Sequence, residues 1–362
     1  MNFKKLSFKT GIFAFAALAL TQLGMHETGT EHILVRLQLQ QYPAQMRQIQ
    51  ALDYDVAGIN FKNKTVDLVV TSAEVTQLKK LGFHTLSARS LVSKASPDQQ
   101  YHTASEVADT LKAYEKAYPD LAQVFTVGKS LEGRDIMAIK ITSHVKKSDP
   151  SKPHILFNGM HHAREVMSTE VPLDTIDFLL TRYGKDSKAT HWVDANEIWV
   201  LPMFNVDGNN QVWTKDTMWR KNTRGGFGVD INRNYPYAWN SCRGSSSNER
   251  AQDYHGTSAG SEPETQVMMD FVKKIRPVFS ISYHSYSEIV IYPYGCEGSH
   301  VPTREVVESI GVEMAGKIVT DDGGGHYKAG TAPELLYSVD GGDIDWMYHE
   351  YQVIPFVIEV NS

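Results

Sequence analysis

The stretch HILFNGMHHAREVMS, residues 154–168, joins a short apolar run to a cluster of polar side chains. The run HILF is typical of a buried strand. His162 and Glu165 follow it three residues apart, so both side chains can turn toward one metal ion just past the strand end. A His-x-x-Glu pair alone is a weak signal, and the adjacent His161 is a rival for His162.

Further apolar runs lie on both sides of this stretch. They are IMAIKI, IWVLPMF, FSISY, IVIY and FVIE, separated by helical or loop segments. This alternation predicts an α/β domain with a mostly buried sheet. His284 directly follows FSISY and, with His162 and Glu165, gives two histidines and one carboxylate, the composition of a catalytic zinc site. The metalloprotease signature His-Glu-x-x-His is absent from the sequence.

Residues 32–87 alternate in the order strand, helix, strand, strand, helix, strand. HILVRLQL, VAGINF, TVDLVV and FHTL are predicted strands, one helix follows Pro43, and Thr71-x-x-Glu74 is a capping box for the second. This βαββαβ order is that of a small ferredoxin-like α+β unit, which we place at residues 25–87. The polar stretch 88–100 is predicted to be an exposed, cleavable linker. The larger domain then spans residues 101–362, and Thr103-x-x-Glu106 caps its first helix.

Residues 1–24 have the pattern of a signal peptide. Lys4, Lys5 and Lys9 precede the apolar run from Gly11 to Leu20, which is too short to span a bilayer. A buried helix and an uncleaved anchor are the alternatives. We expect a secreted, periplasmic or extracellular protein with no membrane attachment once the segment is removed. In such a protein Cys242 and Cys296 can form a disulfide, although two free thiols also fit the sequence.

The composition excludes several classes of protein. The chain has 362 residues, of which 41% are hydrophobic and 22% are charged. These values exclude a largely disordered chain, a collagen-like repeat and a cysteine-rich miniprotein. The formal net charge of -6 offers no basic surface for nucleic acid. We expect a monomer.

Nine blocks, in the right order, resemble the zinc metallocarboxypeptidases of the carboxypeptidase A/B family. They are GKSLEGRDI, GMHHAREVMS, NVDGN, WRKN, GVDINRNY, YHGTSAGSEPET, YHSYSEIVIYPYG, LYSVDGGDIDW and FVIEV, all between Tyr101 and the C-terminus. The resemblance implies a mixed, mostly parallel twisted sheet flanked by helices, one Zn²⁺ per chain, and hydrolysis of the C-terminal bond of peptides and proteins with a free C-terminus. It also implies that the βαββαβ unit is a prosegment that inhibits the enzyme by covering its cleft. An ordinary accessory domain is the alternative.

The resemblance assigns the catalytic residues. His162, Glu165 and His284 would be the zinc ligands, because the family motif places the first histidine two residues before Arg164. Asp230 would orient His162 through its second ring nitrogen. Glu359 would be the general base, with a sheet-edge carboxylate facing water as the alternative reading. Arg220 would stabilise the oxyanion.

The resemblance also assigns the substrate-binding residues. Asn232 and Arg233 would bind the terminal carboxylate, which the planar guanidinium matches with two hydrogen bonds. Arg164 would be a further substrate contact, and Tyr337 would close over the bound residue. Ile344, at the base of the side-chain pocket, implies a preference for apolar or aromatic C-terminal residues. Its neighbour Asp343 stands where the family has a small residue, so basic or broad specificity is the alternative.

Three other functions compete with this assignment. Gly256-Thr257-Ser258-Ala259-Gly260 matches the serine-hydrolase elbow, but AQDYH before it is not strand-like. Ser261-x-x-Glu264 instead predicts the cap of the next helix. A catalytically dead peptide-binding module would have lost a ligand or the base, and all of them are present. An amidase acting on cell-wall peptides or polyglutamate is the third alternative.

The end of the sequence differs from the family pattern. Family catalytic domains continue past the strand of Glu359 into a long helix, whereas this sequence ends at Ser362. Either the sequence is a fragment, or the protein is a shortened member of the family. As written, we expect a chain of reduced stability and an inactive product.

Overall fold

The computed structural model describes residues 32–42, 44–91, 97–147 and 149–361. The predicted signal peptide lies outside these residues. Among the described residues, no helix is long and apolar enough to cross a membrane.

The first unit has the predicted βαββαβ order. Its elements are β1 (His32–Gln38), α1 (Ala44–Ala51), β2 (Asp55–Asn60), β3 (Thr65–Thr71), α2 (Ser72–Lys80) and β4 (His84–Leu91). The strands form an antiparallel sheet in the order β2-β3-β1-β4. Alternate side chains of β1 point inward, so that Val35 and Leu37 pack with Met46 and Ile49 of α1 in one apolar cluster. The predicted capping box at Thr71 is present.

The linker predicted at residues 88–100 starts too early, because β4 continues through Leu91. Residues 88–91 belong to β4, which pairs with β1 as far as His32 opposite Leu91. Main-chain hydrogen bonds to β1 hold this polar segment extended, and such a ladder does not require apolar side chains.

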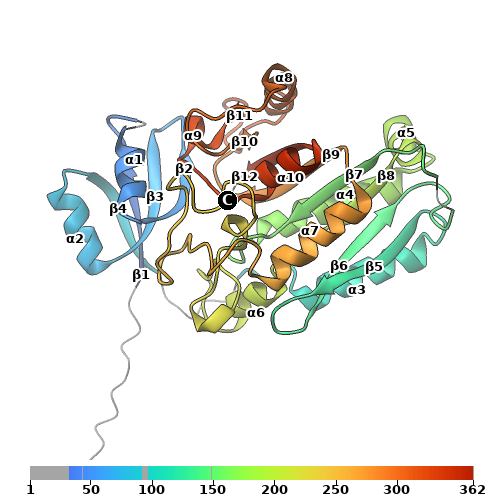
Figure 1. Ribbon diagram of the computed structural model, residues 1–362, viewed down its shortest axis with the longest axis horizontal. Coiled ribbons are helices and arrows are strands. Elements are labelled where there is room, and N and C mark those ends of the chain that lie inside the picture. Colours follow the sequence, from blue (N-terminus) through green and yellow to red (C-terminus); the bar gives the residue numbers. More distant parts are fainter. Residues whose placement is uncertain (1–31, 43, 92–96, 148, 362) are drawn as a thin grey trace, which may run out of the picture. The chain divides into compact units, whose positions relative to one another are not determined.

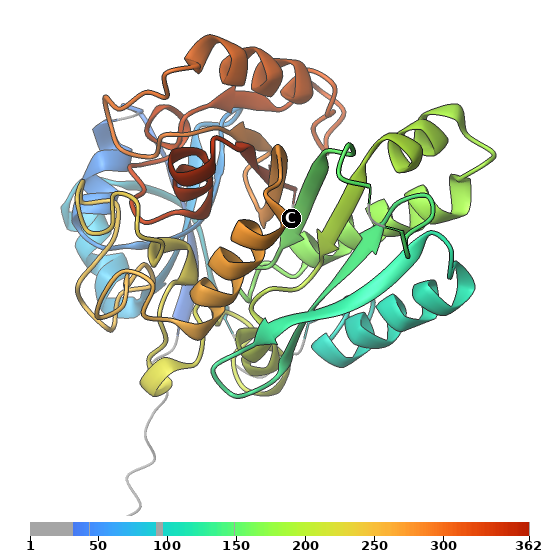
Figure 2. The same ribbon diagram turned by 45° about the vertical axis from the view of Figure 1, so that its right-hand side comes forward.

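The second sheet has eight strands in the order β11-β10-β12-β9-β7-β8-β6-β5, which lie side by side in Figure 1 and Figure 2. Their bounds are β5 (Ala122–Lys129), β6 (Asp135–Ile141), β7 (His154–Gly159), β8 (Glu197–Leu201), β9 (Phe279–Ser285), β10 (Ile289–Ile291), β11 (Lys328–Gly330) and β12 (Ile354–Val360). The central strands β12, β9, β7 and β8 are parallel, as are β10 and β11, and the remaining pairs are antiparallel. The predicted mixed, mostly parallel sheet is therefore confirmed, with β5 and β11 as additional strands.

Helices flank this sheet, as predicted (Figure 1). They are α3 (Ala104–Ala117), α4 (Met167–Arg182), α5 (Ser187–Ala195), α6 (Val206–Thr214), α7 (Pro263–Ile275), α8 (Arg304–Ala315), α9 (Ala332–Leu335) and α10 (Asp343–Tyr351), with 3-10 turns at Arg224–Gly226 and Ile231–Arg233. The helix α3 begins with the predicted capping box at Thr103. The largest apolar cluster packs α3, α4 and α7 against the sheet through residues such as Leu111, Ile176 and Met268.

Two local predictions around residue 260 have different outcomes. Ser258 is exposed in a bend with no named strand before it, so the segment lacks the strand–turn–helix geometry of a serine-hydrolase elbow. The predicted cap at Ser261 is wrong, because Glu262 occupies the N-cap position of α7. The Glu264 carboxylate accepts from the Leu131 N–H and the Asn222 amide, so it is not available to complete a capping box.

Candidate functional site

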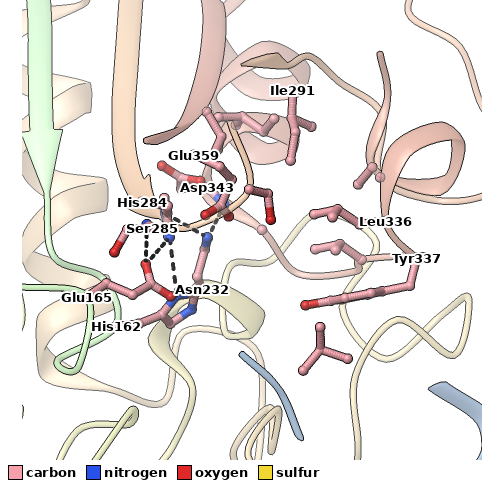
Figure 3. Close-up of a pocket in the computed structure, with 18 of the residues that line it drawn as sticks. His162, Glu165, Asn232, His284, Ser285, Ile291, Leu336, Tyr337, Asp343 and Glu359 are labelled. Carbon is pink, nitrogen blue, oxygen red and sulfur yellow. Dashed lines mark hydrogen bonds and ion pairs between the residues drawn. The ribbon is translucent and has the colours of Figure 1, made fainter. Parts of the chain in front are cut away.

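The carboxyl ends of parallel strands bring three potential metal ligands together. His162 and Glu165 lie in the turn between β7 and α4, and His284 lies in β9, which extends one residue beyond it. One ligand atom from each of these buried residues lies within 4.8 Å of the other two. The His162 Nδ1–Glu165 Oε1 distance is 2.7 Å and the His284 Nδ1–Glu165 Oε2 distance is 2.9 Å (Figure 3).

This donor set fits a divalent cation. The two Nδ1 atoms of His162 and His284 are only 3.2 Å apart, so two ring nitrogens and a carboxylate converge on one point. Two nitrogens and one oxygen, with the fourth position left for water or substrate, match the composition of catalytic zinc sites. Burial alone would raise the pKa of Glu165, but the two histidines hold it well below its usual value.

The second ring nitrogens of both histidines have partners. His162 Nε2 lies 3.2 Å from Asp230 Oδ1, and His284 Nε2 lies 3.4 Å from the Asn232 amide. Burial opposes ionisation of Asp230, yet its contacts with Arg220 and His162 hold its pKa well below the usual range. Such contacts fix the orientation of a ligating imidazole.

The rival histidine lies outside the cluster. His161 is fully buried, its Nε2 lies 3.1 Å from the Tyr235 hydroxyl, and its ring stacks on that of His284 with centroids 5.5 Å apart. Burial lowers the pKa of His161 well below its usual value, so it is a neutral packing partner of His284.

Glu359 lies beside this cluster. Strands β9 and β12 are parallel, and their register places Glu359 directly opposite His284. Since β12 lies between β10 and β9, Glu359 is in the interior of the sheet and not at its edge. It lines the same pocket as the three potential ligands (Figure 3). Burial and the nearby Glu165 raise its pKa to about 7.

The predicted substrate arginines have different environments. Arg220 is buried and paired with Asp230 (2.8 Å) and Glu165 (3.5 Å). Arg233 is also buried but has no ion pair among the described residues, and its Nε and Nη1 donate to the carbonyls of Gly244 and Asn232. A buried guanidinium that lines the pocket without a carboxylate partner is suited to bind an anionic ligand.

Asn232 connects the cluster to the pocket wall. Its side-chain oxygen accepts the Asp343 N–H at 2.9 Å, while its amide group faces His284. The side chain is therefore already engaged on both sides in this structure.

The pocket is lined by both apolar side chains and carboxylates. Ile344, Tyr337 and other apolar side chains line it, together with the carboxylates of Asp343 and Asp345. Neither carboxylate oxygen of Asp343 has a well-formed hydrogen-bond partner among the described residues, and burial raises its pKa. Both predicted specificity residues therefore reach the pocket.

The βαββαβ unit contributes to the same pocket. Val56, Ala57 and Gly58 of β2 line it, and Arg164 donates to both carboxylate oxygens of Asp55 at 2.6 and 2.7 Å. Arg164, predicted to contact substrate, is thus already paired within the chain.

A second set of contacts lies on β3. The Asp67 carboxylate accepts a hydrogen bond from the Tyr286 hydroxyl at 2.6 Å. It also accepts from Nε and Nη2 of Arg36. Asp55, Asp67 and Tyr286 were not among the residues predicted from the sequence. The sequence offers a hint only for Asp67, because a carboxylate within the apolar run TVDLVV would need a partner if it were buried.

Cys242 and Cys296 form a disulfide, so the alternative of two free thiols is wrong. The bond joins the loop after residue 240 to the segment that follows β10. The second of these segments borders the pocket, since Gly295 is one of its lining residues.

Comparisons with known proteins agree with this geometry. Residues 107–362 match the zinc carboxypeptidase family. Carboxypeptidase B2 of Bos taurus is 30% identical over 81% of this chain and 69% of that protein. Metallocarboxypeptidase A of Arthroderma otae is 32% identical over 68% of this chain and 60% of that protein. Zinc carboxypeptidase A 1 of Anopheles gambiae is 30% identical over 68% of this chain, and the match spans only 57% of that relative.

Solved structures show the same fold. Carboxypeptidase A from Helicoverpa armigera superposes with a TM-score of 0.79, over 93% of this chain and 90% of that chain, at 24% identity. Thrombin-activatable fibrinolysis inhibitor gives a TM-score of 0.74, over 91% of this chain and 90% of that chain, also at 24% identity. At this identity the likeness establishes the fold, including the mixed sheet and its flanking helices.

Proposed function

Because this chain belongs to the zinc carboxypeptidase family, we propose that it is a zinc-dependent metallocarboxypeptidase. Its reaction is hydrolysis of the C-terminal peptide bond of peptides and proteins. The observation that carries this proposal is one pocket that contains three converging ligand side chains, a carboxylate beside them, and a buried arginine without a carboxylate partner.

His162, Glu165 and His284 would hold the zinc. Zinc at this position supplies a Lewis acid that makes water a nucleophile near neutral pH. Glu359 takes a proton from the attacking water and passes it to the leaving amine nitrogen. Its raised pKa, about 7, suits a group that must both accept and release a proton near neutrality.

Arg220 and Arg233 each bind a different negative charge of the reacting peptide. Arg220 donates to the oxyanion that develops at the scissile carbonyl, and Asp230 holds its guanidinium in place. Arg233, together with Asn232, binds the terminal carboxylate. An internal peptide bond offers no carboxylate at this point, so a fixed Arg233 restricts the enzyme to free C-termini.

We propose that the pocket prefers apolar or aromatic C-terminal side chains. Ile344 and the apolar wall formed by Ile291, Leu336 and Val357 support this preference. Basic or broad specificity is the second candidate, because the buried Asp343 carboxylate lines the pocket and accepts no hydrogen bond among the described residues. Its nearest ionisable partner is His161, whose Nε2 lies 3.8 Å from Oδ2. Turnover of peptides ending in Phe, Leu, Lys and Arg separates the two, and Asp343→Asn should abolish turnover only of the basic ones.

We also propose that the chain is exported as a proenzyme. Residues 1–24 would be the signal peptide, residues 25–87 the prosegment, and the segment around residues 88–100 the activation site. The Asp55–Arg164 pair and the position of Val56–Gly58 in the pocket support inhibition by the prosegment. The disulfide agrees with an oxidising compartment.

The central experiment combines metal analysis with a substrate pair. The full chain, activated by limited trypsin digestion, should contain one zinc per chain and hydrolyse a peptide acid but not its C-terminal amide. Glu359→Gln should retain zinc and lose most activity, whereas Glu350→Gln, at an exposed position, is the matched control. Equal turnover of acid and amide would refute the carboxypeptidase assignment and favour an amidase.

A further inference from the structure

Three segments far apart in the sequence meet beside the pocket, and Gly295 and Val339 from two of them line it. They are Ser241–Ser245, Gly295–Cys296 and Val339–Asp340. Their main chains are in direct contact, since a Cβ on Gly244 would lie 2.4 Å from the Asp340 nitrogen and one on Gly295 would lie 2.5 Å from the Val339 oxygen. The Val339 N–H donates to the Gly295 carbonyl at 2.9 Å. Any displacement of one segment therefore moves the others.

Asp340 is the main polar connection between these segments. Its side chain is fully buried, and Oδ2 accepts the N–H groups of Ser241, Cys242 and Gly244 at 3.0–3.2 Å. Its Oδ1 accepts the Ser245 hydroxyl. A carboxylate bound by several N–H donors makes strong charge-assisted hydrogen bonds and fixes the conformation of the loop that supplies them.

The disulfide supports the same loop from its other side. Cys242 lies inside the segment that Asp340 binds, and its partner Cys296 directly follows Gly295. The loop is thus held by one covalent bond and by the carboxylate of Asp340.

Arg233 donates a hydrogen bond to this loop. The Gly244 carbonyl accepts from Arg233 Nε at 3.0 Å, and the Asn232 carbonyl accepts from Nη1 at 2.8 Å. Arginine has five N–H donors, so these two contacts leave three for a ligand in the pocket. Gly244 itself is bound through its N–H to Asp340. The chain of contacts runs from Asp340 through Gly244 to the Arg233 guanidinium.

We propose that Asp340 is a positioning residue for recognition of the substrate's terminal carboxylate. It acts through the Gly244 carbonyl on Arg233, and the Cys242–Cys296 bond assists it. The inference rests on the proposed function, which makes Arg233 the carboxylate-binding residue. It adds that carboxylate affinity depends on a buried residue that does not touch the substrate.

The test measures binding and turnover separately. Full-length variants receive the same trypsin treatment, and kcat and KM are determined with a peptide acid. Asp340→Ala should raise KM at least tenfold and change kcat by less than about threefold. Asp340→Asn keeps one acceptor oxygen and should restore part of the affinity. Asp207→Ala is the matched control, because this buried carboxylate also accepts several donors, but at the Ser130–Arg134 turn. It should lower stability without raising KM.

A double-mutant cycle tests whether Asp340 acts through Arg233. In an Arg233→Ala background, Asp340→Ala should add no more than about a twofold change in KM. The same tenfold effect in both backgrounds would overturn the proposal, as would a folded Asp340→Ala protein with unchanged KM. If Asp340→Ala does not fold, Asp340→Asn and the double variant Cys242→Ser/Cys296→Ser must show the raised KM, and unchanged values would overturn the proposal equally.

A titration with acetyl-phenylalanine and its amide distinguishes this inference from the proposed function. Wild type should bind the acid more tightly than the amide, and Asp340→Ala should reduce that selectivity at least tenfold. Wild-type protein without selectivity would overturn both the proposed function and the inference. Selectivity that persists in Asp340→Ala would overturn the inference alone.

Discussion

The Asp55–Arg164 pair should account for much of the inhibition of the full-length chain by its proposed prosegment, here called latency. Both side chains are largely buried, with 10% and 6% of their surfaces exposed, and two short hydrogen bonds join them. Removing one partner of a buried pair costs roughly 3–5 kcal/mol. Asparagine keeps one acceptor oxygen, so about 3 kcal/mol is a reasonable estimate for Asp55→Asn. That value corresponds to about a hundredfold loss of prosegment docking.

The assay compares each full-length variant before and after trypsin digestion. The ratio of the two rates on a small peptide acid measures latency. Asp55→Asn should raise the rate of the undigested chain by up to about a hundredfold, while the digested rate stays at the wild-type value. Asp53→Asn removes the same charge two residues away, at an exposed position whose carboxylate forms no ion pair among the described residues. It should leave latency unchanged.

Two results would refute this reasoning. Unchanged latency in a folded Asp55→Asn protein would show that the ion pair does not hold the prosegment. An equal increase in Asp53→Asn would show that general charge, and not the pair with Arg164, is responsible.

Three further perturbations should have measurable effects. Zinc added to metal-stripped protein at a hundred times its Kd should raise the free energy of unfolding by about 2.7 kcal/mol, measured by thermal unfolding. His284→Ala, which removes one ligand, should abolish this stabilisation. The control His326→Ala, at an exposed position, should retain it. Burial raises the pKa of Asp345 to about 7, so the native state binds more protons than the unfolded chain between about pH 4 and 7. The free energy of unfolding should therefore fall as pH rises through this range, and an Asp345→Asn curve as steep as wild type would contradict this. Gly58→Ala would place a methyl group 2.4 Å from the Tyr286 ring and should weaken prosegment docking, seen as increased activity of undigested chain.

Local sequence patterns predicted the strands, the helices and the polar residues at strand ends, because each of these depends on residues close together in the chain. Alternating apolar runs located most strands, and parallel strands bring their carboxyl ends to one edge of a sheet, which explains why His162 and His284 meet. The capping boxes at Thr71 and Thr103 were predictable for the same reason.

Contacts between distant segments could not be predicted in this way. Nothing near Asp55 indicates that its partner is Arg164, 109 residues later. The extension of β4 through residue 91 depends on the edge that β1 offers, and the composition of residues 88–91 does not reveal it. Glu264 has the spacing of a cap residue, but tertiary partners at Leu131 and Asn222 compete for its carboxylate.

The contacts that the βαββαβ unit makes with the segment Leu335–Ser338 and with Arg243 have an evolutionary consequence. The Tyr42 hydroxyl donates to the Leu335 carbonyl, and the Gln50 amide donates to the carbonyls of Ser338 and Arg243. All three acceptors are main-chain atoms, which every amino acid provides. Side-chain substitutions at these positions can therefore alter the range of accepted peptides while the three contacts with the βαββαβ unit persist. On the proposed function, substrate range and inhibition by this unit can then diverge independently within one gene.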